Sequence, residues 1–270
     1  MKLIFSFSKN IGDYGGGRYT VLDKNNHVLD LYKVSMQRAK HLEHTVKFYG
    51  CSYSLEYLKG FYDTSVNVDD LDLIITDDLK IYIHSQEELG AVTIDGDIIL
   101  SKKLKTIESA DIILEQKELF VPDSPWQTES LFKIINIFRK HNIQTQFSNF
   151  SFIPNYLFNV GILQFNNESV KNLFLDSYYN LRDYYLENIE PIEQLIPKGL
   201  IVSTVICQYY FTSLCYKFNI DYKFTNRIKG NEYIHLNGWA KFKNKKLIKT
   251  LLKEIDGKVK LNSYIDRTVL

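Results

Sequence analysis

The sequence has 270 residues, of which 45% are hydrophobic and 24% are charged, with a formal net charge of +1. This length is enough for one large α/β domain or two small ones, and the composition is typical of soluble globular domains. The near-neutral charge argues against a nucleic-acid binder. The densest basic run, between Lys241 and Lys246, is more typical of a solvated face than of a binding site.

The cysteines and the apolar stretches predict where the protein resides. The three cysteines (Cys51, Cys207 and Cys215) are odd in number and lack metal-type spacing, which favours a reduced cytoplasmic setting. The segment from Met1 to Ser8 is too short for a signal peptide. The uncharged stretch from Gly199 to Tyr216 carries too many polar residues for a spanning helix, so we expect a buried helix and no membrane span.

The first half of the chain alternates apolar runs with turn-rich segments. Lys2 to Ser8 predicts a first strand, and the glycine-rich loop from Asn10 to Gly17 follows it. Such a loop commonly binds nucleotides, although a mobile surface loop is equally compatible, and its glycines form neither a dinucleotide fingerprint nor a P-loop. The pattern then predicts a helix over Leu31–Tyr49, a strand over Leu71–Thr76, a helix over Lys80–Leu89, a buried strand over Ala91–Ile94 and a strand over Asp111–Leu114.

The second half continues the alternation. Ser124 and Pro125 form a good helix start, with Gln127 able to close a capping box. The pattern then predicts an extended segment over Ser151–Phe165 that is interrupted at Asn159–Gly161, helices over Glu168–Glu187 and Leu200–Phe218, a short strand over Tyr233–Leu236 and a helix over Leu247–Ile255. Strands that alternate with helices predict an α/β fold with a mainly parallel sheet covered on both faces.

The most informative segment is Asp95-Gly96-Asp97, which directly follows the apolar run that ends at Ile94. Two carboxylates this close at the end of a buried strand are costly unless a cation neutralises them. Hard oxygen ligands suit Mg²⁺ or Mn²⁺, which can also bridge a diphosphate, and Gly96 allows the backbone to approach a ligand closely. The alternative interpretation is a hairpin turn, for which Asp-Gly is a common signal.

Two later segments carry further polar residues within apolar surroundings. Asn159 and Gly161 interrupt a strand-like run, where a glycine often marks the close approach of a ligand or of another backbone. His235 precedes Gly238 and Lys241: a histidine can be a third ligand for Mn²⁺, and the other two can serve a phosphate. Taken singly, His235 is more typical of a structural histidine than of a metal ligand, and Lys241 is more typical of a solvated charge.

In this order, the three segments resemble glycosyltransferases of the GT-A fold, especially the glycogenin-like and lipopolysaccharide-glucosyltransferase group. That group combines an Asp-x-Asp at a strand end, a later Phe-Asn-x-Gly and a late His-x-x-Gly-x-x-Lys. The corresponding segments here begin at Asp95, Phe158 and His235. The resemblance implies a single GT-A-like domain over residues 1–270, with a nucleotide-binding half over 1–115 and an acceptor-side half, with a C-terminal helix, over 116–270.

The resemblance also implies an activity and a set of partners. It predicts a hexosyltransferase that moves a sugar from a nucleotide-diphosphate donor, above all a UDP-sugar, to a glycan, lipid-linked or protein acceptor. The cofactor would be Mn²⁺ or Mg²⁺, and the anomeric configuration would be retained. Asp97 and His235 would hold the metal, and Asp95 would contact both the metal and the donor ribose.

Other residues follow from the same resemblance. Gly238 and Lys241 would contact the diphosphate, and Asn159 would face the donor sugar or the acceptor. The remaining members of the predicted nucleotide-sugar site are Phe7, Ser8 and Tyr14 near the base, Lys80 near the donor, and the glycines Gly96 and Gly161.

The sequence departs from the family pattern in two regions. Phe242-Lys243 replaces the Pro-Trp that often follows the late lysine. Family members carry an acidic Asp-Gln pair ahead of the helix that follows Phe-Asn-x-Gly, whereas this chain has Ser203-Thr204 there and Glu193-Gln194 upstream. The departure keeps open an alternative, a GT-A-like domain that binds a nucleotide, a glycan or a protein without turnover. A phosphatase of the haloacid-dehalogenase type is disfavoured, because its Asp-x-Asp normally lies near the N-terminus.

Overall fold

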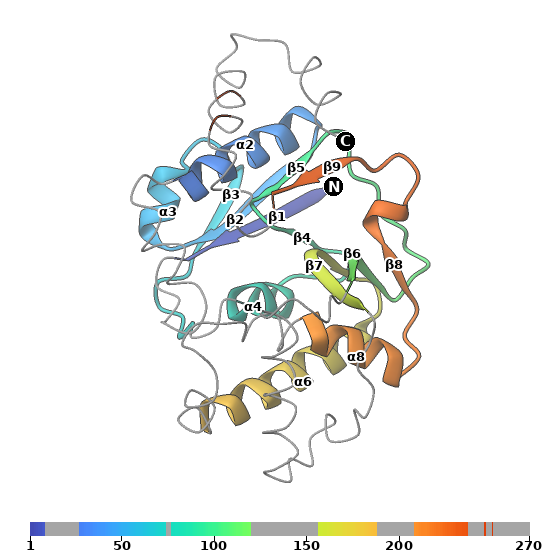
Figure 1. Cartoon of the computed structure of the whole chain (residues 1–270). Helices are drawn as coiled ribbons and strands as arrows, with labels where there is room; N and C mark the ends of the chain where they lie inside the picture. Colours follow the sequence, from blue (N-terminus) through green and yellow to red (C-terminus); the bar gives the residue numbers. More distant parts are fainter. Residues whose placement is uncertain are drawn as a thin grey trace.

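A computed structural model of the chain describes residues 1–8, 27–73, 77–119, 156–187 and 208–236, together with Lys246 and Thr250. Its described strands form one seven-stranded sheet and one two-stranded sheet, with helices on both sides (Figure 1). Strands on both sides of residue 115 belong to the large sheet, and residue 115 itself lies inside one of them.

The large sheet has the strand order β3-β2-β1-β4-β7-β6-β8. Its members are β1 (Lys2–Phe7), β2 (Thr45–Gly50), β3 (Thr64–Asn67), β4 (Val92–Ile94), β6 (Ile112–Leu119), β7 (Tyr156–Phe165) and β8 (Tyr222–Phe224). Pairs β1/β2, β1/β4, β2/β3 and β6/β8 are parallel, whereas β7 runs antiparallel to both of its neighbours. The predicted α/β fold with a mainly parallel sheet is confirmed.

Helices cover both faces of this sheet, as the sequence predicts. Helices α2 (His27–His41) and α3 (Ser52–Tyr57) lie on one face, and α4 (Asp78–Gln86), α6 (Glu168–Glu187) and α8 (Tyr210–Lys217) lie on the other (Figure 1). The alternation of side chains along β1 explains the two layers, because neighbouring residues of a strand point to opposite faces. Leu3 and Phe5 join a buried cluster with residues of α2, and Ile4 joins another with residues of α4.

The strand order creates a position suited to ligands next to β1. The chain passes from β1 to β2 and β3 on one side, and β4 then pairs with β1 on its other side. In open α/β sheets, ligands bind outside the carboxyl ends of the strands at such a reversal. The residues that follow β1 and β4 there are Ser8 and Asp95.

One predicted helix is too long. The expected helix over Leu31–Tyr49 is instead α2, which ends at His41, followed by strand β2 from Thr45. The change of direction occurs at Glu43, which has a φ of 60° in the left-handed region. Apolar residues on both sides of this turn continue the helical spacing, so the pattern alone does not reveal the break.

Strand β7 corrects a second expectation. The expected interruption at Asn159–Gly161 does not end the strand, because β7 runs from Tyr156 to Phe165. It affects only the pairing with β6, which shifts register between Asn159 and Leu163. The segment Leu71–Leu73 is not a strand, and the rest of that expected strand lies outside the described residues. The chain also contains α3, β3 and β8, which the sequence analysis does not identify.

Several expected elements agree with the structure. Helix α6 has the expected bounds, and α4, β4 and β6 overlap their expected ranges. The loop Asn10–Gly17, the helix from Ser124, most of Leu247–Ile255 and residues 200–207 lie outside the described residues. Within the described ranges, no helix has both the length and the apolar character needed to traverse a bilayer.

Candidate metal centre

The Asp-Gly-Asp segment connects β4 to β5 (Ile98–Leu100), and β5 pairs antiparallel with β9 (Tyr233–His235). In this register Ile98 lies opposite His235. The backbone N–H of Leu236 also donates to the carbonyl of Asp97 at 3.0 Å. Pairing of two short strands therefore brings His235 next to Asp97 from a distant part of the chain.

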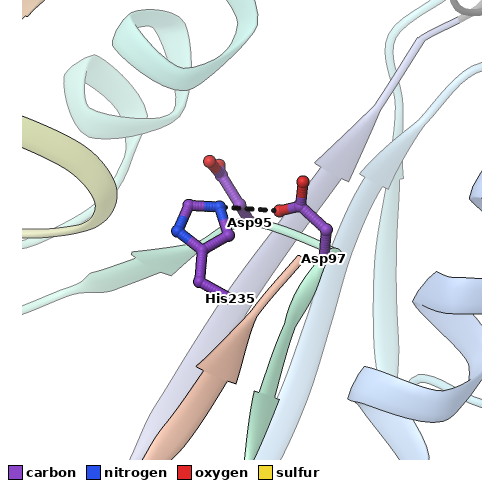
Figure 2. A group of neighbouring side chains, drawn as sticks. All are labelled: Asp95, Asp97 and His235. Carbon is purple, nitrogen blue, oxygen red and sulfur yellow. Dashed lines mark ion pairs between the residues drawn. The ribbon is translucent and has the colours of Figure 1, made fainter. Parts of the chain in front are cut away.

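The side chains of Asp95, Asp97 and His235 meet at this point (Figure 2). Each offers one potential ligand atom, and these atoms all lie within 4.8 Å of one another. The Nε2 atom of His235 is 3.3 Å from Oδ1 of Asp97. Two hard carboxylate oxygens and one imidazole nitrogen are a donor set that suits Mn²⁺ or Mg²⁺, so the residues fit the cation that the sequence predicts.

The segment is not the simple hairpin turn of the alternative interpretation. Strands β4 and β5 belong to different sheets and do not pair with each other. Gly96 is buried beneath α2, where Ser35 donates from Oγ to the Gly96 carbonyl at 2.7 Å. A Cβ at position 96 would lie 2.2 Å from the Tyr32 ring, so a side chain cannot be accommodated without movement of that ring.

Tyr32 extends this arrangement to the end of β1. Its hydroxyl donates to the carbonyl of Ser6 at 2.7 Å. Burial, reinforced by the charges of Asp95 and Asp97, raises the pKa of Tyr32 well above its usual value, so its hydroxyl stays protonated and keeps this hydrogen bond. Helix α2 thereby holds the Asp-Gly-Asp turn and the end of β1 together.

Lys80 of α4 brings a positive charge to the same place. Its Nζ donates to Oδ1 of Asp95 at 2.7 Å and to the Val160 carbonyl at 2.8 Å, and only 9% of the residue is exposed. The sequence predicts Lys80 as a donor-contacting residue, and the structure places it directly against Asp95.

The Asn159–Gly161 segment of β7 also lies beside the Asp-Gly-Asp turn. The N–H of Asp95 donates to the Gly161 carbonyl at 2.7 Å. The Asn159 side chain donates from Nδ2 to Oε1 of Glu118 at 2.6 Å and accepts from the Gly161 N–H at 2.8 Å. These bonds satisfy the polar side chain within the sheet, which explains why Asn159 does not interrupt the strand.

Glu115 is a residue of the site that the sequence analysis does not identify. Its Oε1 is 2.8 Å from Nδ1 of His235, and its side chain is completely buried. Burial raises the pKa of Glu115, whereas the hydrogen bond and the charge of His235 oppose that rise. The only signal in the sequence is a single acidic residue directly after the apolar run Ile112–Leu114, where the expected strand ends.

The two carboxylates change the protonation of His235. Burial alone would lower the pKa of this imidazole, but hydrogen bonds to Asp97 and Glu115, together with their charges, raise it to about 10. A cation that binds at Nε2 must therefore displace a proton, as is general for metal sites that contain histidine.

The remaining predicted residues fall into two groups. Phe7 and Ser8 lie at the carboxyl end of β1, where the Phe7 ring packs edge-to-face on Tyr32 at a centroid distance of 5.6 Å and Ser8 is buried. Tyr14, Gly238 and Lys241 lie outside the described residues. The segments Glu193-Gln194 and Ser203-Thr204, where the sequence departs from the family pattern, lie outside them as well.

Comparisons with known proteins give matches among solved structures. No protein-family model matches the sequence, and the search of curated proteins finds no match either. One similar structure is the galactosyltransferase LgtC in complex with donor and acceptor sugar analogues, at 13% identity and a TM-score of 0.47, covering 97% of this chain and 98% of that one.

Two further solved structures are also similar to this chain. Mouse xyloside xylosyltransferase 1 is 10% identical, with a TM-score of 0.43 and coverage of 93% of this chain and 94% of that one. The glycosyltransferase GlyE of Streptococcus pneumoniae is 10% identical, with a TM-score of 0.40 and coverage of 95% and 63%. All three are glycosyltransferases.

Proposed function

We propose that this chain is a glycosyltransferase that uses a divalent cation to bind a nucleotide-diphosphate sugar, with a UDP-sugar as the expected donor. The observation that carries the proposal is the meeting of Asp95, Asp97 and His235 within 4.8 Å, at the carboxyl end of β4 beside β1. The strand order of the large sheet reverses between β1 and β4, and open α/β sheets bind nucleotides at such a reversal. The acceptor is a glycan, a lipid-linked molecule or a protein.

The residues have the following proposed roles. Asp97 and His235 hold the cation, and Asp95 contacts the cation and the ribose. A bound Mn²⁺ or Mg²⁺ would supply Lewis-acid stabilisation of the leaving diphosphate. Gly238 and Lys241 contact that diphosphate, where Lys241 adds positive charge as the bond to the sugar breaks.

The other residues orient the donor. Phe7, Ser8 and Tyr14 lie near the base, and Gly96 and Gly161 let the backbone come close to the ligand. Lys80 fixes Asp95 through the 2.7 Å contact and adds charge near the donor. Asn159 faces the sugar or the acceptor, and orientation of the acceptor hydroxyl toward the anomeric carbon supplies much of the rate. The motif resemblance favours retention of the anomeric configuration.

A donor screen tests this function. Nucleotide-sugars are compared by thermal shift with and without Mn²⁺, because a ligand that binds the native state raises its apparent stability. The expected result is that one donor stabilises the protein only when Mn²⁺ is present. The same donor is then incubated with the protein, and release of free nucleoside diphosphate is measured. A transferase should hydrolyse the donor slowly, whereas a protein that only binds the donor should release none.

A variant of the cation site tests the role of the metal. Asp97→Asn removes one carboxylate charge and should lower donor turnover by about 100-fold or more. Glu232→Gln removes an equal charge from an exposed side chain near the start of β9 and should leave turnover unchanged. Full wild-type activity after removal of metal with EDTA would contradict the proposed mechanism.

A further inference from the structure

The pairing of β6 with β7 is irregular beside Glu115, the residue that contacts His235. The register shifts between Leu114 and Gln116, so Glu115 has no partner in β7, and β7 carries the surplus residues 160–162 opposite it. Irregularities of this kind concentrate next to functional sites. The Glu115 carboxylate contacts the Nδ1 of His235 in β9 at 2.8 Å, and the Glu115 carbonyl accepts from the Tyr233 hydroxyl at 3.3 Å.

The burial of this carboxylate is unusual for a residue with only a packing role. The Glu115 side chain is completely buried, and its Oε2 has no hydrogen-bond partner among the described residues. A buried carboxylate is costly unless a partner compensates it. The partner of Oε1 is the imidazole of His235, which also contacts Asp97 through its other nitrogen.

Gly161 provides the space for this carboxylate. A Cβ at position 161 would lie 2.4 Å from Oε2 of Glu115 and 3.0 Å from Cδ1 of Ile98. A contact of 2.4 Å cannot persist, so any side chain at position 161 forces the Glu115 carboxylate to move. The glycine of the second sequence motif therefore leaves room for the residue that contacts the histidine of the third motif.

We propose that Glu115 is a positioning residue for the cation site: it accepts the Nδ1–H of His235 and so presents Nε2 to the cation, with Gly161 keeping the place of its carboxylate free. In metal sites, the hydrogen bond at one imidazole nitrogen decides which nitrogen binds the metal, and it also fixes the ring orientation. The inference rests on the proposed cation site, but it concerns how His235 is held and does not depend on which sugar is transferred.

Binding of Mn²⁺ alone, measured by calorimetry, is the main test. Glu115→Ala should weaken Mn²⁺ binding by about 10- to 100-fold, as is typical when the partner of a metal-bound histidine is lost. Glu115→Gln, whose side-chain carbonyl can still accept the Nδ1–H, should stay within about threefold of the wild type. Wild-type affinity in Glu115→Ala, or equal losses in the Ala and Gln variants, would overturn the proposal.

A double-mutant cycle tests the connection to Gly161. Gly161→Ala should weaken Mn²⁺ binding because its new methyl group displaces the Glu115 carboxylate. In the Glu115→Ala/Gly161→Ala double variant the two losses should not add, because the methyl group no longer meets a carboxylate. Additive losses would show that Gly161 acts on the site by another route. Gly161→Ala also serves as the test if Glu115→Ala does not fold.

A spectroscopic measurement on metal-free protein separates this proposal from the proposed function. In ¹⁵N-histidine NMR, with His235→Gln to assign the signal, Nδ1 of His235 should appear as a hydrogen-bonded N–H in the wild type and in Glu115→Gln. In Glu115→Ala the signal should shift, and an unchanged signal would exclude the positioning role. A wild-type protein that binds neither Mn²⁺ nor Mg²⁺ would contradict the proposed function, while the NMR result would still decide the role of Glu115.

Discussion

Lys80 brings a buried ammonium group into a site whose neighbouring side chains are mainly acidic. Its Nζ is shared between Asp95 and the Val160 carbonyl of β7. The charge of Lys80 has two opposite effects on the site. It neutralises Asp95 when the cation is absent, and it repels a cation that binds to the same carboxylate.

Replacement of Lys80 should separate these two effects. In Lys80→Met the free energy of unfolding without metal should fall by about 1–3 kcal/mol, because the Val160 carbonyl loses a buried donor and Asp95 loses its partner. Affinity for Mn²⁺ should rise roughly fivefold, as about 1 kcal/mol of repulsion is removed. Urea unfolding and calorimetry measure the two quantities.

An exposed lysine provides the control for Lys80. Lys102 pairs with Glu232 on the surface, where both side chains are more than half exposed. Lys102→Met should change the free energy of unfolding by less than about 1 kcal/mol and should leave Mn²⁺ affinity unchanged. If Lys80→Met binds Mn²⁺ more weakly than the wild type, Lys80 supports the cation by holding Asp95, and its charge does not weaken Mn²⁺ binding.

At the level of elements, the sequence pattern predicts long regular segments better than the turns between them. Helix α6 matches its expected bounds because its amphipathic pattern starts beside Asn167, whose Oδ1 accepts from the N–H of Val170. Helix α2 ends earlier than expected. The chain turns at Glu43 through a left-handed backbone conformation, and because no glycine stands at this position, the sequence does not indicate the turn.

The same distinction applies to the candidate site. Asp95 and Asp97 stand out in the sequence because a charged pair follows a buried strand, and the motif resemblance adds His235. The β5–β9 pairing that brings His235 to Asp97 joins two strands of three residues each, which are too short for any periodicity to reveal. Glu115 is not identified because its partner His235 belongs to a distant strand, which no local pattern reveals.

The contact between α2 and the Asp-Gly-Asp turn leads to a prediction about element packing. Gly96→Ala places a methyl group 2.2 Å from the Tyr32 ring, which is held by its hydrogen bond to Ser6. The free energy of unfolding should fall by about 3 kcal/mol, the upper part of the usual range for overpacking. Urea unfolding followed by circular dichroism measures the loss.

Removal of the ring tests whether this clash is the cause. Tyr32→Ala lowers the free energy of unfolding by itself. In the Tyr32→Ala/Gly96→Ala double variant, however, the methyl group at position 96 no longer contacts an aromatic ring. The second substitution should therefore cost about 1 kcal/mol or less, and the cycle should show positive coupling between the two positions. A cost for Gly96→Ala that is the same with and without the ring would mean that the contact with Tyr32 is not what requires the glycine.

At the scale of the whole molecule, Glu87 joins several elements on the α4 face of the sheet. Its carboxylate accepts hydrogen bonds from Lys2 of β1 at 2.8 Å and from Lys47 and Tyr49 of β2 at 2.6 Å each. Its carbonyl accepts from Lys171 of α6 at 2.9 Å. Glu87 lies just after the last residue of α4, so one residue connects two helices and two strands.

This network makes the stability of the fold depend on pH. Burial opposes ionisation of Glu87, but the hydrogen bonds from Lys2, Lys47 and Tyr49 outweigh it and lower the pKa to about 2, from a usual value of 4.5. Because the folded-state pKa is depressed, the stabilisation is fully present above about pH 4.5 and is lost as the pH falls toward 2. A difference of this size corresponds to about 3 kcal/mol.

Glu87→Gln should remove this dependence. At pH 7 the free energy of unfolding of the variant should be about 3 kcal/mol lower than that of the wild type. This difference should shrink steadily between pH 4.5 and pH 2, where the wild-type carboxylate becomes protonated. Urea unfolding at several pH values measures the difference. Glu56→Gln, which alters a largely exposed side chain on α3, should show a small difference that does not vary over this range. A Glu87→Gln difference that stays constant with pH would show that the carboxylate stabilises the fold through its shape and hydrogen bonds and not through its charge.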